Sequence, residues 1–208
     1  YPQAEYPYRK LIAENRARGR HEPEYELQDT GVFDGERYFD VFAEYAKSDA
    51  DPDDLLIRIT VVNRGPDAAS LDVLPQLWFR NTWSWGGEDE ESGPKPRIFA
   101  RGDGAVEAEH HALGRIHLRG AHGPDGRAPE LLFTENETNN ERVFHCANPS
   151  PYVKDAFHEV VVHGRTEAAN PRHTGTKAAL RYRLRLAGGA SAELRLRLRL
   201  RREIVVSE

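Results

Sequence analysis

Apolar and polar residues alternate along most of the chain, and a period of two residues predicts strands with two different faces. The longest alternating runs span residues 55–62, 69–79, 179–187 and 192–201. Shorter runs, separated by turns rich in glycine or proline, span residues 97–100, 105–109, 115–119 and 130–134. Because no long helical pattern intervenes, the predicted fold class is all-β, an antiparallel β-sandwich.

A short helix is predicted near the N-terminus, at residues 9–18, where apolar residues form a narrow stripe and Gly19 follows. Residues 20–26 are mostly charged and contain a proline, which is typical of a linker. We therefore divide the chain into an extended lead-in with a short helix at 1–26 and a β-sandwich domain at 27–208.

Four local predictions accompany this division. Residues 27–42 combine turn signals with aromatic residues, which two short strands around an Asp34-Gly35 turn would explain. Pro75 cannot donate a ladder hydrogen bond, so a bulge or a sheet edge is expected there. Residues 159–163 are predicted as a strand after an irregular turn or short helix. The polar stretch at 86–96 is the first candidate for a disordered loop.

Leucine and arginine alternate along the last two runs, on either side of Gly188-Gly189, which predicts a long hairpin. One face carries the leucines, and the other carries Arg181, Arg183, Arg185, Arg195, Arg197 and Arg199. Like charges that face each other across strands destabilise a sheet. We therefore expect these arginines on a wet outer face or beside carboxylates from another layer. The formal net charge of −5 disfavours their interpretation as a surface for phosphate or nucleic acid.

All three tryptophans of the chain, Trp78, Trp83 and Trp85, lie within eight residues. The alternation around Trp78 indicates a strand with both faces covered, so this ring is expected in the core. Beyond Arg80 the pattern breaks, and the chain is expected to leave the strand for a loop. The indole rings of Trp83 and Trp85 either anchor a core or, with Asn81 beside them, stack on sugar rings at a surface.

Composition narrows the classes of function. A net charge of −5 over 208 residues gives no electrostatic footprint for nucleic acid or an anionic membrane. No apolar run approaches the roughly twenty residues that a membrane-spanning helix needs. Cys146 is the only cysteine, so neither an intramolecular disulfide nor a cysteine-based zinc site can form. Because the chain holds no methionine, we expect it to be a piece of a longer protein.

The sequence contains none of the specific catalytic or nucleotide-binding motifs GxGxxG, P-loop, GxSxG or HExxH. The neighbours His110 and His111 are expected to point to opposite faces of a strand, so they would not share a metal. No metal and no cofactor is therefore expected. Glu135 and Glu137 could in principle flank a glycosidic bond, although acidic residues in a polar loop are usually solvated.

The most reactive-looking cluster is His158 with Glu159, near Lys154 and Asp155. Loop residues that cap a turn give the plainer account of it.

The chain also contains a series of distinctive short words: Asp29-Thr30-Gly31-Val32-Phe33, Arg37-Tyr38-Phe39-Asp40-Val41-Phe42, Glu44-Tyr45-Ala46-Lys47, Asn63-Arg64-Gly65-Pro66, Leu77-Trp78-Phe79-Arg80-Asn81-Thr82-Trp83-Ser84-Trp85, Phe133-Thr134-Glu135-Asn136-Glu137-Thr138-Asn139, Ser150-Pro151-Tyr152-Val153-Lys154-Asp155 and Gly175-Thr176-Lys177. Through these short motifs, which span nearly the whole chain, the sequence resembles the bacterial glucosidase-like proteins of glycoside hydrolase family 63.

The resemblance implies a supersandwich β-domain that precedes an (α/α) barrel in a large cytoplasmic enzyme of carbohydrate metabolism. Catalysis in that family is inverting, with an aspartate as general acid and a glutamate as general base, both on the barrel. This chain resembles the sandwich portion alone, so no catalytic residue carries over to it and it is expected to be inactive by itself. The implied partners are the C-terminal barrel of the same parent chain and α-glycosides or oligosaccharides, with no nucleic acid and no membrane.

Three hypotheses follow. The first is a non-catalytic accessory domain, whose interface or cleft-rim residues would be Asn81, Trp83, Trp85, Lys154 and Asp155, although plain domain packing is the simpler account of each. The second is a free-standing carbohydrate-binding module, in which Trp83 and Trp85 must expose at least one flat indole face. The third is an enzyme complete in itself around Asp155, His158 and Glu137.

Overall fold

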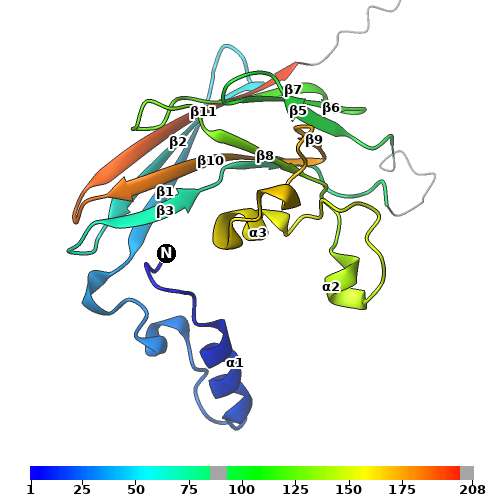
Figure 1. Ribbon diagram of the computed structural model, residues 1–208. Coiled ribbons are helices and arrows are strands. Elements are labelled where there is room, and N and C mark those ends of the chain that lie inside the picture. Colours follow the sequence, from blue (N-terminus) through cyan, green and yellow to red (C-terminus); the bar gives the residue numbers. More distant parts are fainter. Residues whose placement is uncertain (85–92, 202–208) are drawn as a thin grey trace, which may run out of the picture. The chain divides into compact units, whose positions relative to one another are not determined.

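The computed structural model describes residues 1–84 and 93–201 and consists mainly of antiparallel strands (Figure 1). The strands are β1 (Phe39–Lys47), β2 (Asp54–Asn63), β3 (Ala69–Val73), β4 (Gln76–Trp78), β5 (Arg97–Ala100), β6 (Ala105–His110), β7 (Gly114–Gly120), β8 (Glu130–Thr134), β9 (Thr174–Gly175), β10 (Lys177–Leu186) and β11 (Ser191–Arg201). The helices are α1 (Tyr8–Ala17), α2 (Asn140–Phe144) and α3 (Ala156–His163), with 3-10 turns η1 (Leu27–Thr30), η2 (Asp34–Glu36) and η4 (Thr166–Ala168).

The strands form two sheets. The larger sheet has seven strands in the order β1-β2-β11-β7-β6-β5-β9, and the smaller has four, in which β10 pairs with β3, β4 and β8. The fold class is therefore all-β, an antiparallel sandwich with a short N-terminal helix, as the sequence predicts.

The chain folds as two compact units. Unit 1 comprises Tyr1–Ala43, Ile59–Leu71 and Arg183–Glu193, and unit 2 comprises Glu44–Arg58, Asp72–Tyr182 and Leu194–Glu208. Each unit contains strands of both sheets. The boundary predicted at residue 26, between lead-in and sandwich, stays a prediction.

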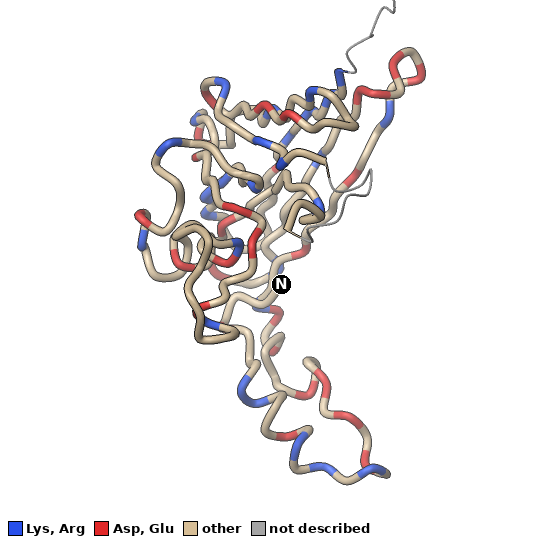
Figure 2. The backbone as a smooth tube through the Cα atoms, turned by 90° about the vertical axis from the view of Figure 1, so that its right-hand side faces the viewer, with Lys and Arg blue, Asp and Glu red and all other residues tan. Residues whose placement is uncertain are grey.

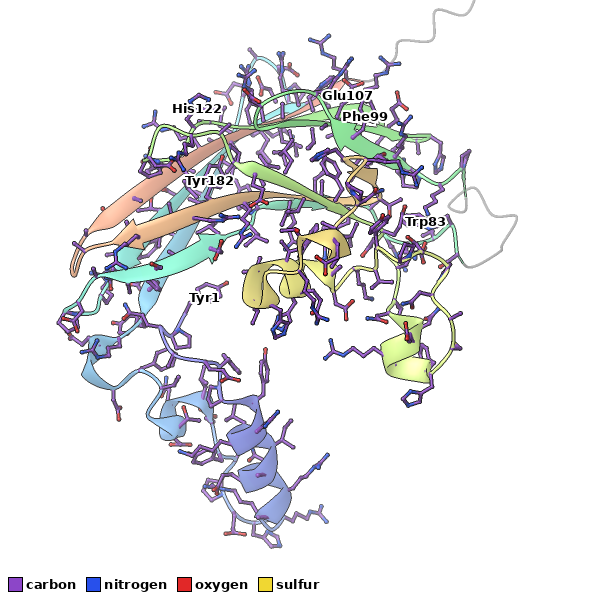
Figure 3. The ribbon with its side chains drawn as sticks, in the orientation of Figure 1. Tyr1, Trp83, Phe99, Glu107, His122 and Tyr182 are labelled. Atoms are coloured by element: carbon purple, nitrogen blue, oxygen red, sulfur yellow. The ribbon has the colours of Figure 1, made fainter. Side chains whose placement is uncertain are left out.

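The core of unit 2 lies between its two sheets. The side chains that fill it are almost fully buried and come from both sheets: Ile98, Val106, Ala108 and Leu118 from the larger, and Phe133, Ala178 and Leu180 from the smaller. Tyr182 joins the layers, because its hydroxyl donates a 2.8 Å hydrogen bond to the carbonyl of Ala121 (Figure 3). Burial raises the pKa of Tyr182 to about 12, which keeps this donor protonated.

Helix α3 covers the other face of the smaller sheet. Phe157 and Val160 of the helix are buried against Leu132 and Ala179 of the sheet. The strand predicted at 159–163 is therefore wrong. The three consecutive valines favour a strand by propensity, but burying two residues three positions apart on one side requires a helix. Gly164, with φ of 68°, ends that helix.

The predicted hairpin of the last two runs is also wrong, because β10 belongs to the smaller sheet and β11 to the larger. Alternation correctly predicts the buried leucine faces, since Leu180 and Leu194 both enter the core. The arginines do meet carboxylates, as Arg181 does with Asp72 at 2.6 Å and Arg197 does with Asp54. These carboxylates come from neighbouring strands of the same sheet rather than from another layer.

Two further predictions concern strand boundaries. Pro75, where a bulge or a sheet edge is predicted, lies in a break between β3 and β4, and Leu180 donates to its carbonyl at 3.0 Å. Of the two short strands predicted within 27–42, the first is wrong, because the 3-10 turns η1 and η2 lie there and Gly35 has a φ of 66°. The second coincides with the start of β1 at Phe39.

Trp78 is not part of the core, contrary to the prediction, because 54% of it is exposed. It lies in a strand of three residues, where alternation turns Phe79 inward and the tryptophan outward. One face of this strand is therefore covered, and the ring lies on the other.

In unit 1, helix α1 matches the predicted helix within a residue at each end. The buried side chain of Asn63 joins several segments of this unit. Its amide group donates to the carbonyls of Asp67, Leu186 and Ala187 at 2.8–3.1 Å. Its oxygen accepts from the side chain of Gln3 at 2.6 Å and from the Gly65 N–H at 2.9 Å.

Candidate functional site

The ends of three strands bring polar loops together at one end of the smaller sheet. Lys177, which begins β10, lies opposite Trp78 at the end of β4 and opposite Thr134 at the end of β8. The segments that follow β4 and β8 therefore leave the sheet at the same end. We call the side chains that meet there the carboxylate cluster: Asn81, Trp83, Lys95, Glu135, Asn136, Glu137 and Thr176.

Glu137 is the centre of the carboxylate cluster. Its Oε2 accepts a 2.8 Å hydrogen bond from the Asn81 amide, and its Oε1 accepts a 2.7 Å bond from the Trp83 indole N–H. Its side chain is only 14% exposed. Asn81 also donates to the carbonyl of Asn136 at 3.0 Å. One carboxylate thus holds the loop after β4 against the loop after β8.

Glu135 fixes the start of the same loop. Its Oε2 accepts from the Thr176 hydroxyl at 2.8 Å and lies 3.0 Å from the ammonium of Lys95. The same hydroxyl accepts from the Asn136 N–H at 2.7 Å. The Lys95 nitrogen also lies 4.0 Å from Glu137, so one ammonium lies close to both carboxylates.

Lys154 and Asp155 attach to the next part of the loop. The Asp155 carboxylate accepts from the Asn139 amide at 3.3 Å and from Arg142 at 3.1 Å. The backbone N–H of Lys154 donates to the Glu137 carbonyl at 3.0 Å. The Lys154 carbonyl in turn accepts from Lys177 at 2.9 Å. Burial lowers the pKa of Lys177.

The predicted site residues therefore fall into two adjoining groups. Asn81 and Trp83 meet at Glu137, and Lys154 and Asp155 hold the segment that follows it. Trp85 lies outside the described residues, as do positions 86–92 of the loop predicted to be disordered. The role of these residues at an interface or a cleft rim stays a prediction.

The sequence suggests Glu135 and Glu137 as solvated acids or as a pair that flanks a glycosidic bond, and not as acceptors that join loops; Lys95 and Thr176 were missed. The only hint of their role in the sequence is that both glutamates belong to the short motif Phe133–Asn139.

The cluster proposed for a self-contained enzyme is not assembled by its side chains. The ring of His158 lies against His163 at 5.4 Å, while Asp155 and Glu137 hold the partners described above. Glu159 pairs with Arg165. Each group is thus engaged with its own neighbours, which suits structural roles.

His110 and His111 also differ from expectation, since their rings stack at 4.5 Å. Strand β6 ends at His110, so the next residue no longer follows the strand alternation. The His110 Nδ1 accepts from the N–H groups of Ala112 and Leu113, and desolvation lowers the pKa of this histidine. Within residues 1–84 and 93–201, no group of three or more His, Cys, Asp or Glu side chains is placed to hold a metal ion.

Comparison with known proteins gives one informative match. No protein-family model matches the chain. The chain is 36% identical over 201 residues to the uncharacterized protein YMR196W of Saccharomyces cerevisiae. This alignment covers 85% of the chain and 18% of the yeast protein, so the chain spans less than a fifth of that relative. Among the described residues, no helix is long and apolar enough to cross a membrane.

The bonds to Glu137 lead to a direct prediction. Glu137→Ala removes the acceptor of both the Trp83 indole and the Asn81 amide, so it should cost about 1–3 kcal/mol of stability. Tryptophan emission should also change, and that change should be absent when Trp83 is already phenylalanine. Urea unfolding and steady-state fluorescence measure both effects.

The matched control for this prediction is Glu141→Ala, which removes an exposed carboxylate from the nearby helix α2. It should leave emission and unfolding midpoint near those of the parent. Equal behaviour of the two variants would contradict the role given to Glu137.

Proposed function

We propose that this chain is a non-catalytic β-sandwich unit of a larger glycoside hydrolase of the family 63 type, which acts on α-glycosides. In this proposal the carboxylate cluster stiffens the loops at the edge of the sandwich that faces the catalytic domain. The observation that carries it is the engagement of Glu137, whose two carboxylate oxygens hold Asn81 and Trp83.

The chemistry of glycoside hydrolysis supports a non-catalytic role. An inverting enzyme needs one carboxyl group to protonate the leaving oxygen and a second, roughly 6.5–9.5 Å away, to activate a water. Glu137 binds two loop side chains instead, and Glu135 binds Thr176 and Lys95. Both carboxylates therefore act as acceptors that join loops, which suits support of a neighbouring domain.

The outward side of the smaller sheet supports packing against another domain. Figure 1 shows α2 and α3 on the side of this sheet that faces away from the larger sheet. The large apolar side chains there that are more than half exposed are Trp78, Val143, Phe144 and Val162. Exposed apolar groups of this kind are typical of surfaces that a partner covers. In this proposal the partner is the helical barrel of the same parent polypeptide.

The proposal is tested by adding glucose and short α-glucosides to the 208-residue chain and measuring released sugar and tryptophan fluorescence in the same samples. We expect no release above a protein-free blank and no saturable change in fluorescence. Hydrolysis that disappears in Glu137→Gln would overturn the non-catalytic assignment.

A carbohydrate-binding module would give a different result from the same titration. Trp83 is partly buried and its N–H is bonded to Glu137, so only part of the ring is open to a sugar. A saturable fluorescence change without hydrolysis, lost in Trp83→Ala and kept in Trp78→Ala, would favour the module over the supporting domain.

A further inference from the structure

The outward face of the larger sheet carries a dense set of arginines in unit 2. Along β5, β6, β7 and β11, residues alternate between core positions and outward positions. We call the outward set the arginine face: Arg97, Phe99, Glu107, Glu109, Arg115, His117, Arg119, Arg195, Arg197, Arg199 and Arg201. It contains seven arginines and two glutamates. Figure 2 shows basic residues recurring along the chain, with acidic residues among them, and Figure 3 places Glu107 and Phe99 on this outward side.

Strand register sets basic residues directly opposite one another on this face. In the pairing of β7 with β11, the opposed pairs are Arg119 with Arg197, His117 with Arg199, and Arg115 with Arg201. Like charges in directly opposite positions weaken a sheet. Two of the three pairs set arginine against arginine, which is unfavourable for folding unless carboxylates or a ligand offset the repulsion.

The arginine face already binds carboxylates from its own chain. Glu107, only 2% exposed, accepts from Arg101 at 2.8 Å and lies 3.5 Å from His117. The hydrogen bond from Arg101 holds the pKa of Glu107 below its usual value, and Arg197 does the same for Asp54. Bidentate guanidinium groups suit carboxylates in geometry as well as charge.

These internal carboxylates leave an excess of positive charge. With Arg101 and the neighbouring Asp51 and Asp54 included, the face holds eight arginines against four carboxylates. The carboxylates of Glu107 and Asp54 lie buried beneath their partners, whereas the side chains of Arg101 and Arg197 are at least half exposed. The side chains of Glu109 and Asp51 are also nearly half exposed, so the solvent side carries both signs of charge, with arginines in the majority.

Arg119 shows this excess most clearly. Its cross-strand neighbours are Ala105 on one side and Arg197 on the other, so neither directly opposite position offers a carboxylate. The residue is exposed. Because Arg197 is already paired with Asp54, an acidic group from outside the chain would be met by the side chain of Arg119.

We propose that the arginine face binds an extended acidic segment of another polypeptide, with carboxylates at alternate residues. Alternate residues of β11, from Arg195 to Arg201, repeat at about 6.6–6.8 Å, and alternate side chains of an extended peptide repeat at the same distance. A peptide aligned with β11 would therefore present successive carboxylates to successive arginines. This inference is independent of the proposed function, because it concerns the opposite side of the sandwich from the carboxylate cluster's sheet.

Two observations favour an acidic peptide over a nucleic acid. Single-stranded nucleic acids are typically held by stacking on open aromatic faces. Phe99 instead has the guanidiniums of Arg97 and Arg101 at 5.1 and 5.9 Å from its ring centre. The net charge of −5 also weakens long-range attraction of a long polyanion, whereas a short acidic segment meets only the local face.

Fluorescence anisotropy of a labelled peptide of about sixteen residues, alternating glutamate and serine, tests the proposal at about 50 mM salt. The full 208-residue chain should bind it saturably. Arg119→Gln with Arg201→Gln should weaken binding by roughly tenfold or more. The matched control, Arg9→Gln with Arg20→Gln, removes the same charge from exposed positions in unit 1 and should change binding by less than about twofold.

Arg119→Glu separates loss of binding from loss of folding. It places a carboxylate opposite Arg197, so the thermal unfolding temperature should equal or exceed that of the parent while peptide binding is lost. A variant that loses binding only because it unfolds would instead show a lower unfolding temperature, and that outcome would count against the proposal.

Three results would overturn it. The first is no saturable binding of the peptide by the parent chain. The second is equal weakening in the Arg119/Arg201 and Arg9/Arg20 double variants, which would indicate attraction by charge alone. The third is tighter binding of a single-stranded oligothymidylate, or of phosphatidylserine vesicles, than of the peptide, which would assign the face to a nucleic acid or a membrane.

Discussion

Gly175→Ala should destabilise the chain by about 1–3 kcal/mol, because an added β-carbon would overlap the backbone of Thr134. That carbon would clash with the Thr134 carbonyl oxygen and lie 2.9 Å from its carbonyl carbon. Backbone cannot move aside as a flexible side chain can. For a chain of about 200 residues this cost lowers the unfolding temperature by roughly 2–12 °C, which differential scanning calorimetry measures.

The same substitution should disturb the carboxylate cluster. Thr134 directly precedes Glu135, and Gly175 directly precedes Thr176, which bonds to that glutamate. Pushing β8 away from β9 therefore moves both partners, and tryptophan emission should change in the same direction as in Glu137→Ala. Gly19→Ala is the control, because its β-carbon would meet only the Glu22 carboxylate, at 3.3 Å. The prediction would be contradicted if the tryptophan emission and the unfolding temperature of Gly175→Ala matched those of Gly19→Ala.

Strand positions could be predicted where alternation is complete. Strands β5 and β8 coincide with the predicted runs 97–100 and 130–134, since a proline directly precedes each. Partners could not be predicted, because alternation indicates which face is buried and not which strand lies beside it. The leucines of β10 and β11 therefore suggested a hairpin, although the two strands lie in different sheets.

Predictions from residue propensity were wrong where tertiary packing had the larger effect. The valines of 159–163 favour a strand, but Phe157 and Val160 gain more by lying together on one side of a helix against the sheet. The alternation around Trp78 predicts a strand with both faces covered, and therefore a buried ring. Its position opposite Lys177 instead turns it to the outward face.

Some residues of the candidate site could be predicted from the sequence, but the hydrogen bonds between them could not. Asn81 and Trp83 were selected because a polar loop follows an aromatic strand. Their shared partner, Glu137, lies 56 residues beyond Asn81 in the sequence. Only the pairing of both β4 and β8 with β10 brings the two loops together. A single sequence carries no signal for such a pairing, so the hydrogen bonds could not be derived from it.

The two faces of the sandwich in unit 2 differ in chemistry. The smaller sheet turns exposed apolar side chains such as Trp78 outward beside α3, whereas the larger sheet turns arginines outward. Apolar surface favours a stable packed interface, and a charged surface favours an interaction that depends on ionic strength. If both proposals hold, salt should weaken binding of the acidic peptide and leave packing on the smaller sheet unchanged.

Asn63→Ala should be the most damaging polar substitution in unit 1, at roughly 2–4 kcal/mol. The side chain is fully buried, and its amide group serves the carbonyls of Asp67, Leu186 and Ala187. Alanine leaves those carbonyls and the Gly65 N–H without this partner, and each unsatisfied buried group costs free energy. The urea midpoint should fall while the slope of the transition stays constant.

A graded series distinguishes this role from a general loss of packing. Gln3→Ala removes one bond to Asn63 and a long 3.5 Å bond to the Tyr38 carbonyl, so it should cost about 1 kcal/mol. Asn170→Ala, in unit 2, removes one bond to the Thr174 carbonyl and one from the Arg172 N–H, and should fall between the other two. If Asn63→Ala costs no more than Gln3→Ala, the carbonyls find other partners and Asn63 does not join the segments of unit 1. If the order holds, one buried amide stabilises the turn at Gly65 and the end of β10 together, because both depend on the same side chain.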